Sequence, residues 1–350
     1  MSIVEINNLV KKYGDNVAVN DLSLNIDSKG VYGFLGPNGA GKSTTMNVLT
    51  GYIGATSGTV KINGYDIFKE PEEAKKNVGY LPEIPPLYQD MTVYEYLEFV
   101  SKIKKIKKEE RKACIEQSLE MTRTTEVRER LIRNLSKGYK QRVGIAQAIM
   151  GMPDLIILDE PTVGLDPKQI IEIRDLIRNL GKEHTVILSS HILTEISEVC
   201  ENIFIISQGK LVASGREEEL IEELAGENRI EAIIKGDANE IENILDKFGC
   251  KHSIETLDDE KCKAQIVTSR DIDIREGLFF ALAEKKMPLL ELKFKTKSLE
   301  DLFIELTTEY KAQPKKKGLK FKKKNSEKLD DKNLADNLKN EEKEVQEVEK

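Results

Sequence analysis

Apolar and polar residues alternate in two short runs near the start of the chain, Ile3–Ile6 and Leu22–Ile26. A period of two is typical of half-exposed antiparallel strands. The runs Val31–Leu35, Leu155–Leu158 and Thr185–Leu188 are apolar almost throughout, which predicts buried strands. Strands covered on both faces are typical of a parallel sheet. The pattern therefore predicts an α/β fold with a parallel sheet and an antiparallel β subdomain.

Helical periodicity replaces these patterns between Thr92 and Met150. Apolar residues recur at the i, i+3, i+4 and i+7 spacing of one helix face, namely at Val93, Tyr96, Leu97 and Val100. We expect a helical insert over about residues 90–150. Its lysine-rich part, Lys102–Lys112, is expected to form a solvated helix face and turn. Short strands at 59–64 and 78–81 and a hairpin at 203–213 would complete a first domain of residues 1–225.

A second pattern occupies residues 226–310. Its elements follow the order strand, helix, strand, strand, helix, strand, over residues 229–235, 239–248, 252–256, 264–268, 273–284 and 289–294. This β-α-β-β-α-β order suggests a small ferredoxin-like unit in an accessory α+β domain. Ser298 and Asp301 have the spacing of a helix cap and predict a further helix to Tyr310. Residues 226–310 show no set of residues typical of a catalytic site. Their role is therefore expected to be either that of a dimerising or docking module or that of a stabilising extension.

Residues 311–350 are expected to form a charged, flexible tail. Positions 311–324 hold eight lysines and no acidic residue, whereas positions 325–350 hold five lysines and nine acidic residues. A segment with so few large apolar residues does not bury enough surface to fold by itself. The lysine block suits contact with anionic lipid head groups, or it belongs to a solvated tail that folds back on its own acidic residues.

The amino-acid composition argues against several classes of function. Of the 350 residues, 39% are hydrophobic and 33% charged, and the formal net charge of −7 argues against nucleic acid as a partner. The four cysteines show no C-x-x-C spacing, so a reducing cytoplasm is favoured over a disulfide framework or a zinc site. No window approaches the roughly 18 apolar residues of a membrane span, so membrane association is expected to depend on a partner.

The stretch GPNGAGKST carries the main candidate chemistry. It satisfies G-x-x-x-x-G-K-[ST] and lies between a predicted strand and a predicted helix. Glycines let the backbone approach phosphates closely, and a helix N-terminus adds partial positive charge. Lys42 would reach the β- and γ-phosphates, and the Ser43 hydroxyl would serve Mg²⁺. A nucleoside triphosphate site is predicted at Gly36, Pro37, Asn38, Gly39, Ala40, Gly41, Lys42, Ser43 and Thr44.

Two carboxylates, Asp159 and Glu160, follow a buried strand at its carboxyl end, the edge where α/β sheets bind ligands. They fit either a surface turn or, beside a phosphate loop, catalysis. In the second case Asp159 would hold the Mg²⁺ shell and Glu160 would orient the attacking water. His191 follows the next buried strand and is either structural or a donor to the γ-phosphate. Tyr13 is either a packing residue or a ring that stacks on a purine.

Together these motifs resemble an ATP-binding cassette (ABC) ATPase over about residues 2–215. GPNGAGKST resembles the Walker A motif, LIILDEP the Walker B motif with its catalytic glutamate, and His191 the switch histidine. GLDP, which includes Asp166, resembles the D-loop, and Leu135–Arg142 resembles the family signature. The resemblance implies the P-loop NTPase fold and ATP with Mg²⁺ as its cofactors.

The resemblance also implies a head-to-tail homodimer or pseudo-dimer. Each ATP would lie between one subunit's phosphate loop and the other's signature, with Ser136, Lys137 and Gly138 at the nucleotide. Tyr13 would then stack on adenine.

Some residues depart from the family pattern. Glu83 stands where the family usually has a glutamine that meets Mg²⁺ or water, and Lys137 and Tyr139 replace a glycine and a glutamine of the signature. These features and the segment Ser298–Thr307 resemble the drug- and antibiotic-export branch.

An ATP-hydrolysing exporter subunit at the cytoplasmic face of the cell membrane is therefore expected, working with separate membrane-spanning permease subunits. The alternative is a soluble ABC ATPase that acts on ribosomes or DNA. Ribosome-associated relatives typically carry two cassettes, whereas this chain has one phosphate loop and one signature. A regulatory cassette without turnover is opposed by the presence of Glu160 and His191.

Overall fold

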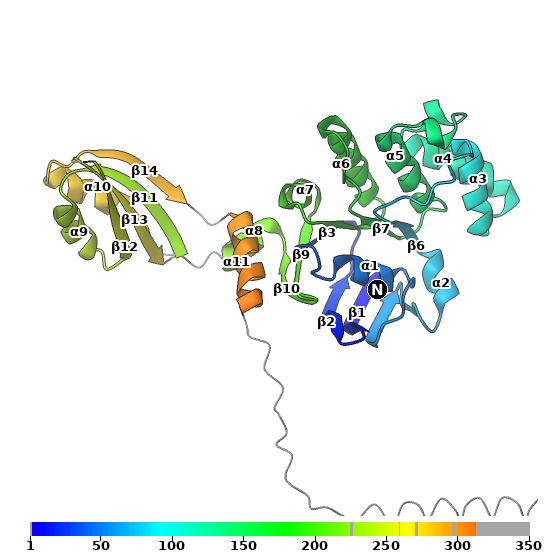
Figure 1. Cartoon of the computed structure of the whole chain (residues 1–350), viewed down its shortest axis with the longest axis horizontal. Coiled ribbons are helices and arrows are strands. Elements are labelled where there is room, and N and C mark those ends of the chain that lie inside the picture. The colour runs from blue at the N-terminus through cyan, green and yellow to red at the C-terminus, as the bar shows by residue number, and fades with distance from the viewer. Residues whose placement is uncertain (1, 225–226, 259, 270–271, 296–297, 313–350) are drawn as a thin grey trace, which may run out of the picture. The chain divides into compact units, whose positions relative to one another are not determined.

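A computed structural model describes residues 2–224, 227–258, 260–269, 272–295 and 298–312 (Figure 1). Most of the predicted charged tail, from residue 313 on, lies outside the described residues. No helix in the described part of the chain combines the length and the apolar character that a membrane crossing requires.

The predicted antiparallel subdomain is a four-stranded sheet with the order β2-β1-β4-β5. Its strands are β1 (Val4–Tyr13), β2 (Asn16–Ile26), β4 (Ser57–Ile62) and β5 (Tyr65–Asp66). In β2 the side chains of Leu22, Leu24 and Ile26 are buried and those between them are exposed. The period of two thus separates a core face from a solvent face, as predicted.

The central sheet has six strands in the order β10-β9-β3-β8-β7-β6. They are β3 (Gly30–Leu35), β6 (Val78–Leu81), β7 (Leu155–Asp159), β8 (Thr185–Ser190), β9 (Asn202–Ser207) and β10 (Lys210–Gly215). All neighbours are parallel except β9 and β10, which form the predicted hairpin. Every residue of β3, β7 and β8 is buried, which explains their continuous apolar runs.

Two hydrophobic clusters cover the two faces of this sheet. On one face, α1 (Lys42–Leu49) packs with the antiparallel sheet through Met46 and Leu49. On the other face lie α5 (Lys137–Ile149), α6 (Pro167–Gly181) and α7 (Leu193–Val199), as can be followed in Figure 1. The carboxyl ends of the parallel strands are therefore held between two packed layers. A short helix, α2 (Pro71–Lys76), precedes β6.

The predicted helical insert consists of α3 (Val93–Ile103), α4 (Lys108–Met121), the two 3-10 turns η1 (Thr125–Val127) and η2 (Ile132–Asn134), and α5. The predicted apolar face of α3 is buried in a cluster with α4 and α5. Thr92 and Glu95 cap α3 reciprocally through side chain and backbone.

In the stretch Lys102–Lys112, predicted as a solvated helix face and turn, the other lysines are exposed but Lys104 is not. This side chain is half-buried, and its Nζ donates to the carbonyls of Ala148 at 3.0 Å and Met150 at 2.7 Å. The last carbonyls of a helix lack partners within the helix and carry partial negative charge, so an ammonium group stabilises the end of α5.

The accessory elements follow the predicted order. They are β11 (Glu227–Lys235), α9 (Ala238–Asp246), β12 (Lys251–Asp258), β13 (Lys261–Ser269), α10 (Arg275–Glu284) and β14 (Leu289–Lys295). Their antiparallel sheet has the order β12-β13-β11-β14 and a hydrophobic cluster of its own.

Helices α8 (Glu217–Leu224) and α11 (Leu299–Ala312) precede and follow this unit, and Leu220 and Leu299 belong to the cluster of the central sheet. Ser298 caps α11 through Asp301, as predicted. The domain boundaries at 225/226 and 310/311 stay predictions.

Candidate functional site

The phosphate loop connects β3 to α1 at the carboxyl edge of the central sheet. Gly41 precedes α1 with φ of 105°, a conformation that glycine adopts at low cost. A Cβ on Gly41 would lie 2.5 Å from the carbonyl oxygen of Ala18 in β2, and one on Gly36 would lie 2.4 Å from that of Ile206 in β9. The loop is therefore wedged between two strands that the sequence places far apart.

Lys42 points back into this loop. Its Nζ donates to the carbonyl of Gly36 at 2.7 Å and lies 3.8 Å from Oε1 of Glu160. Burial lowers the pKa of Lys42, and the carboxylates of Glu160 and Asp159 oppose that shift. An ammonium held by a carbonyl and a carboxylate offers a charge that anionic phosphate oxygens would also attract.

Asp159 is the last residue of β7. Its carboxylate accepts hydrogen bonds from the hydroxyls of Ser189 and, at 3.4 Å, Ser43. A hydroxyl and a carboxylate converge here beside the loop, and such oxygen donors fit Mg²⁺ when phosphate oxygens and water complete its shell.

Glu160 and His191 meet above the ends of β7 and β8. Glu160 has φ of 48°, an uncommon backbone conformation for a residue with a side chain. Its amide donates to Oγ of Ser189 at 3.0 Å, and its Oε2 lies 3.0 Å from Nδ1 of His191. The backbone thus directs the Glu160 carboxylate toward His191 and Lys42.

Many of the predicted nucleotide residues line one cavity of about 550 Å³. It is lined by the phosphate loop from Asn38 to Thr44 together with Tyr13, Glu83, Glu160 and His191. Gly36, Pro37 and Asp159 are not among its lining residues. Tyr13, at the end of β1, is half-exposed, and Nζ of Lys11 lies 5.0 Å from the centre of its ring.

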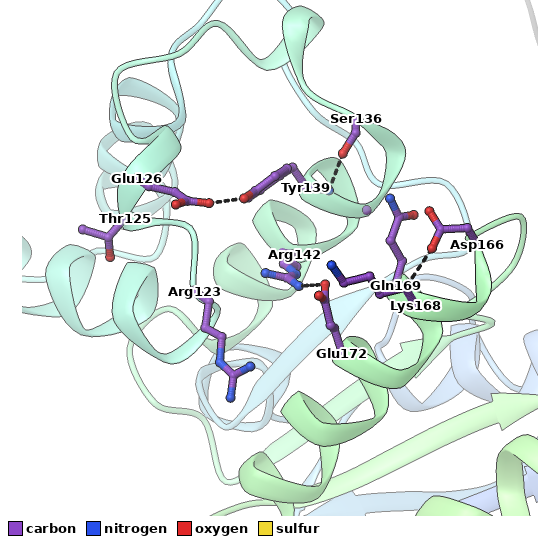
Figure 2. Close-up of a pocket in the computed structure, with 11 residues that line it drawn as sticks. Arg123, Thr125, Glu126, Ser136, Tyr139, Arg142, Asp166, Lys168, Gln169 and Glu172 are labelled. Atoms are coloured by element: carbon purple, nitrogen blue, oxygen red, sulfur yellow. Dashed lines mark hydrogen bonds and ion pairs between the residues drawn. The ribbon is translucent and has the colours of Figure 1, made fainter.

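The signature residues line a second cavity, of about 620 Å³ (Figure 2). Ser136 is the N-cap of α5 and Asp166 is the N-cap of α6, so the two helices start at the same cavity. Gly138 is buried, and a Cβ there would lie 2.7 Å from the side chain of Gln169. The Tyr139 hydroxyl contacts Glu126, and Arg142 pairs with Glu172, as the dashed lines in Figure 2 show.

Lys137 and Glu83, two departures from the family pattern, line a third cavity of about 240 Å³. Glu83 also lines the nucleotide cavity, whereas Lys137 lies against Gly164, where a Cβ would be 2.1 Å from its Nζ. Within one chain, Ser136, Gly138 and Asp166 therefore lie apart from the phosphate loop.

Comparison with known proteins places this geometry in a family. The family model described as "ABC transporter" matches residues 19–163. The linearmycin resistance ATP-binding protein LnrL of Bacillus subtilis is 32% identical over 87% of this chain and 98% of its own length. The chain belongs to the ABC transporter ATP-binding proteins. As a member of this family it binds nucleotide and hydrolyses ATP.

Other ABC proteins extend the comparison. The bacitracin transport ATP-binding protein BcrA of Bacillus licheniformis is 42% identical over 60% of this chain and 69% of its own length. A solved ATP-binding subunit of an ABC transporter superposes with a TM-score of 0.58 at 29% identity, covering 63% of this chain and 92% of its own. An ATP-binding cassette in its ADP conformation gives 0.57 at 28% identity, covering 64% and 94%. The predicted family and the predicted ABC ATPase fold are confirmed.

Sequence reasoning missed some residues around the nucleotide cavity of this ABC ATPase. Asn16, Val17 and Ala18 line it from the start of β2, and Val163 lines both this cavity and that of Lys137. Tyr13 ends β1 and Asn16 begins β2, so these three residues lie just across a β-hairpin from Tyr13. The predicted role of Tyr13 was therefore the signal in the sequence that could have identified them. Val163 carries no comparable signal, because an apolar residue between two motifs is most often packing.

Proposed function

We propose that two copies of this chain, or one copy and a related subunit, close head to tail over two ATP molecules. The supporting observation is that the cavity of Ser136, Gly138 and Asp166 shares no lining residue with the nucleotide cavity of the same chain. A second copy would bring its Ser136 helix N-terminus, which attracts anions, to the phosphates bound at Lys42.

ATP entry would rearrange the contacts of Glu160. In the structure its carboxylate lies near both Lys42 and His191. Phosphate oxygens would compete for both partners, because Lys42 and a His191 N–H are better matched to a highly charged phosphate. Glu160 would then be free to accept a proton from the attacking water. Ser43, Asp159 and Glu83 would hold Mg²⁺, which neutralises charge on the β- and γ-phosphates when bound.

We further propose that the work of hydrolysis drives export through separate membrane-spanning subunits at the cytoplasmic face of the membrane. Two relatives of this chain are named for bacitracin transport and linearmycin resistance. The Glu83 and Lys137 departures favour the same export branch. Co-expression with a candidate permease, followed by purification on the permease, tests this part. We expect this chain to co-purify in about equal amounts, and its absence from the purified permease would contradict the partner.

The dimer is tested by mixing two inactive variants of the full chain. In Glu160→Gln the signature is intact, and in Ser136→Arg the nucleotide cavity is intact. If the signature acts across the dimer, a mixed dimer restores one complete site. ATPase activity is then expected to reappear on mixing, with a quadratic dependence on total chain concentration in the dilute range. If mixing restores no activity, while each variant still binds ATP, the head-to-tail homodimer is wrong, and only the dimer with a related subunit is left.

A further inference from the structure

Glu195 is a buried carboxylate that the nucleotide site itself does not use. It lies in α7, is 5% exposed, and is not among the residues that line the nucleotide cavity. Its Oε2 accepts two hydrogen bonds, from Oγ1 of Thr162 at 2.7 Å and from Oγ of Ser190 at 2.8 Å. A buried carboxylate is costly unless donors surround it, so these contacts are strongly favoured.

Thr162 belongs to the loop that carries Glu160, whereas Ser190 is the last residue of β8, immediately before the loop that carries His191. Thr162 lies two residues after Glu160, and Ser190 directly precedes His191. The paired backbones of β7 and β8 end at Asp159 and Ser189. Beyond that point the amide of Glu160 still donates to the carbonyl of Ser189 at 3.2 Å, and Ser190 pairs with Leu35 of β3, whereas Thr162 lies outside the sheet. Glu195 links Thr162 to Ser190 through one oxygen atom.

The direction of each hydrogen bond is fixed by the carboxylate. An ionised carboxylate only accepts, so both hydroxyl protons must point toward Glu195. The Ser190 oxygen is then left as an acceptor, and it accepts from the amide of Ile192 at 3.0 Å. The backbone is therefore pinned on both sides of His191, and the loop after Glu160 is tied to the same oxygen.

We propose that Glu195 is a positioning residue for ATP hydrolysis, which sets the relative placement of Glu160 and His191 by holding Thr162 and Ser190. The inference rests on the proposed roles of Glu160 and His191. Lys42 and Asp159 keep contacts that do not involve Glu195, so nucleotide binding does not depend on it. Loss of Glu195 lowers the rate of turnover and leaves ATP affinity intact.

The test compares four single variants of the full chain, and the double variant Thr162→Val/Glu195→Ala, for kcat, for ATP affinity and for thermal unfolding. Glu195→Ala is expected to lower kcat about 10- to 100-fold, the range for a misplaced catalytic group, with the dissociation constant of ATP changed less than about 3-fold. Glu195→Gln keeps one oxygen that can accept both hydroxyls and should recover most of the rate. Thr162→Val removes one donor at constant shape, and its effect should be non-additive with that of Glu195→Ala. Glu198→Ala, on the same helix but exposed and paired with Arg174, is the matched control and should leave kcat unchanged.

Two results overturn the inference. One is a Glu195→Ala protein that folds and turns over within about 2-fold of the wild type. The other is a Glu195→Ala protein in which kcat and ATP affinity fall in equal proportion. If Glu195→Ala does not fold, the same comparison is made with Thr162→Val. Glu160→Gln, measured alongside, separates the proposed role of Glu160 from that of Glu195. If Glu160→Gln retains turnover, the proposed role of Glu160 is wrong, whatever the result for Glu195. If Glu160→Gln is inactive and Glu195→Ala is fully active, only the proposed role of Glu195 is wrong.

Discussion

Gly79 sits where β6 crosses the end of α5, and replacing it with alanine is expected to push the two apart. A Cβ at this position would lie 2.2 Å from the carbonyl oxygen of Ala148 and 2.8 Å from its carbon. Real Cβ contacts essentially never fall below 3.0 Å, so strand and helix would have to separate by roughly 0.8 Å. The obstacle is main chain, which cannot rotate away as a side chain can.

The same contact carries other interactions. The Ala148 carbonyl accepts from Nζ of Lys104 at 3.0 Å, and Nε2 of the neighbouring Gln147 donates to the carbonyl of Tyr80 at 2.6 Å. Overpacking typically costs about 1–3 kcal/mol, and a lost hydrogen bond to a charged group adds about 1.5–3 kcal/mol. We therefore expect Gly79→Ala to lower the free energy of unfolding by about 2.5–6 kcal/mol.

Urea denaturation followed by circular dichroism, with the melting temperature as a second readout, measures this loss. At about 2–4 °C per kcal/mol, the expected drop in melting temperature is roughly 5–24 °C. Gly54→Ala is the matched control, since a Cβ at Gly54 meets nothing within 4 Å and its φ is not positive. That variant should stay within about 0.5 kcal/mol of the wild type. Equal stability of the two variants would refute the steric argument.

Two other predictions concern a pKa and a ring. Burial lowers the pKa of Lys104 from 10.5 to about 8, so the folded state releases this proton first as pH rises. The difference in unfolding free energy between the wild type and Lys104→Met should be constant below pH 8. Between pH 8 and 10.5 it should rise in favour of the wild type by up to about 1.4 kcal/mol per pH unit. Urea melts measure this difference, and a difference that does not change with pH would contradict the prediction. If Tyr13 stacks on adenine, titration calorimetry should find ATP binding weakened about 5- to 150-fold in Tyr13→Ala and nearly unchanged in Tyr13→Phe. Equal affinities in all three proteins would leave Tyr13 a packing residue.

Much of the nucleotide cavity could be predicted from the sequence because its chemistry is local. GPNGAGKST has to lie between a strand and a helix to work, and the apolar run before it and the helical residues after it are adjacent in the chain. Asp159 and Glu160 likewise follow their strand directly. A turn, a strand end or a helix start is fixed by a few consecutive residues, so motif and context are visible together.

The position of the signature relative to the phosphate loop could not be predicted in this way. Ser136 lies inside the helical insert, more than ninety residues after Lys42. Only the packing of α5 on the sheet decides that the two residues line different cavities of one chain. Lys104 was expected to be solvated, and this expectation was wrong for a related reason. Its hydrogen-bond partners, the carbonyls of Ala148 and Met150, are more than forty residues away, so no local sequence pattern indicates the contact.

The sequence by itself determined the type and order of the elements, the phosphate loop and the ends of β7 and β8, because these depend on side-chain period and on backbone chemistry within a few residues. Tertiary structure alone decided that β3 lies between β8 and β9, that Ala18 and Ile206 confine the loop, and that Glu195 ties Thr162 to Ser190. These contacts join residues distant in the chain, and their partners are selected by burying both faces of the sheet at once.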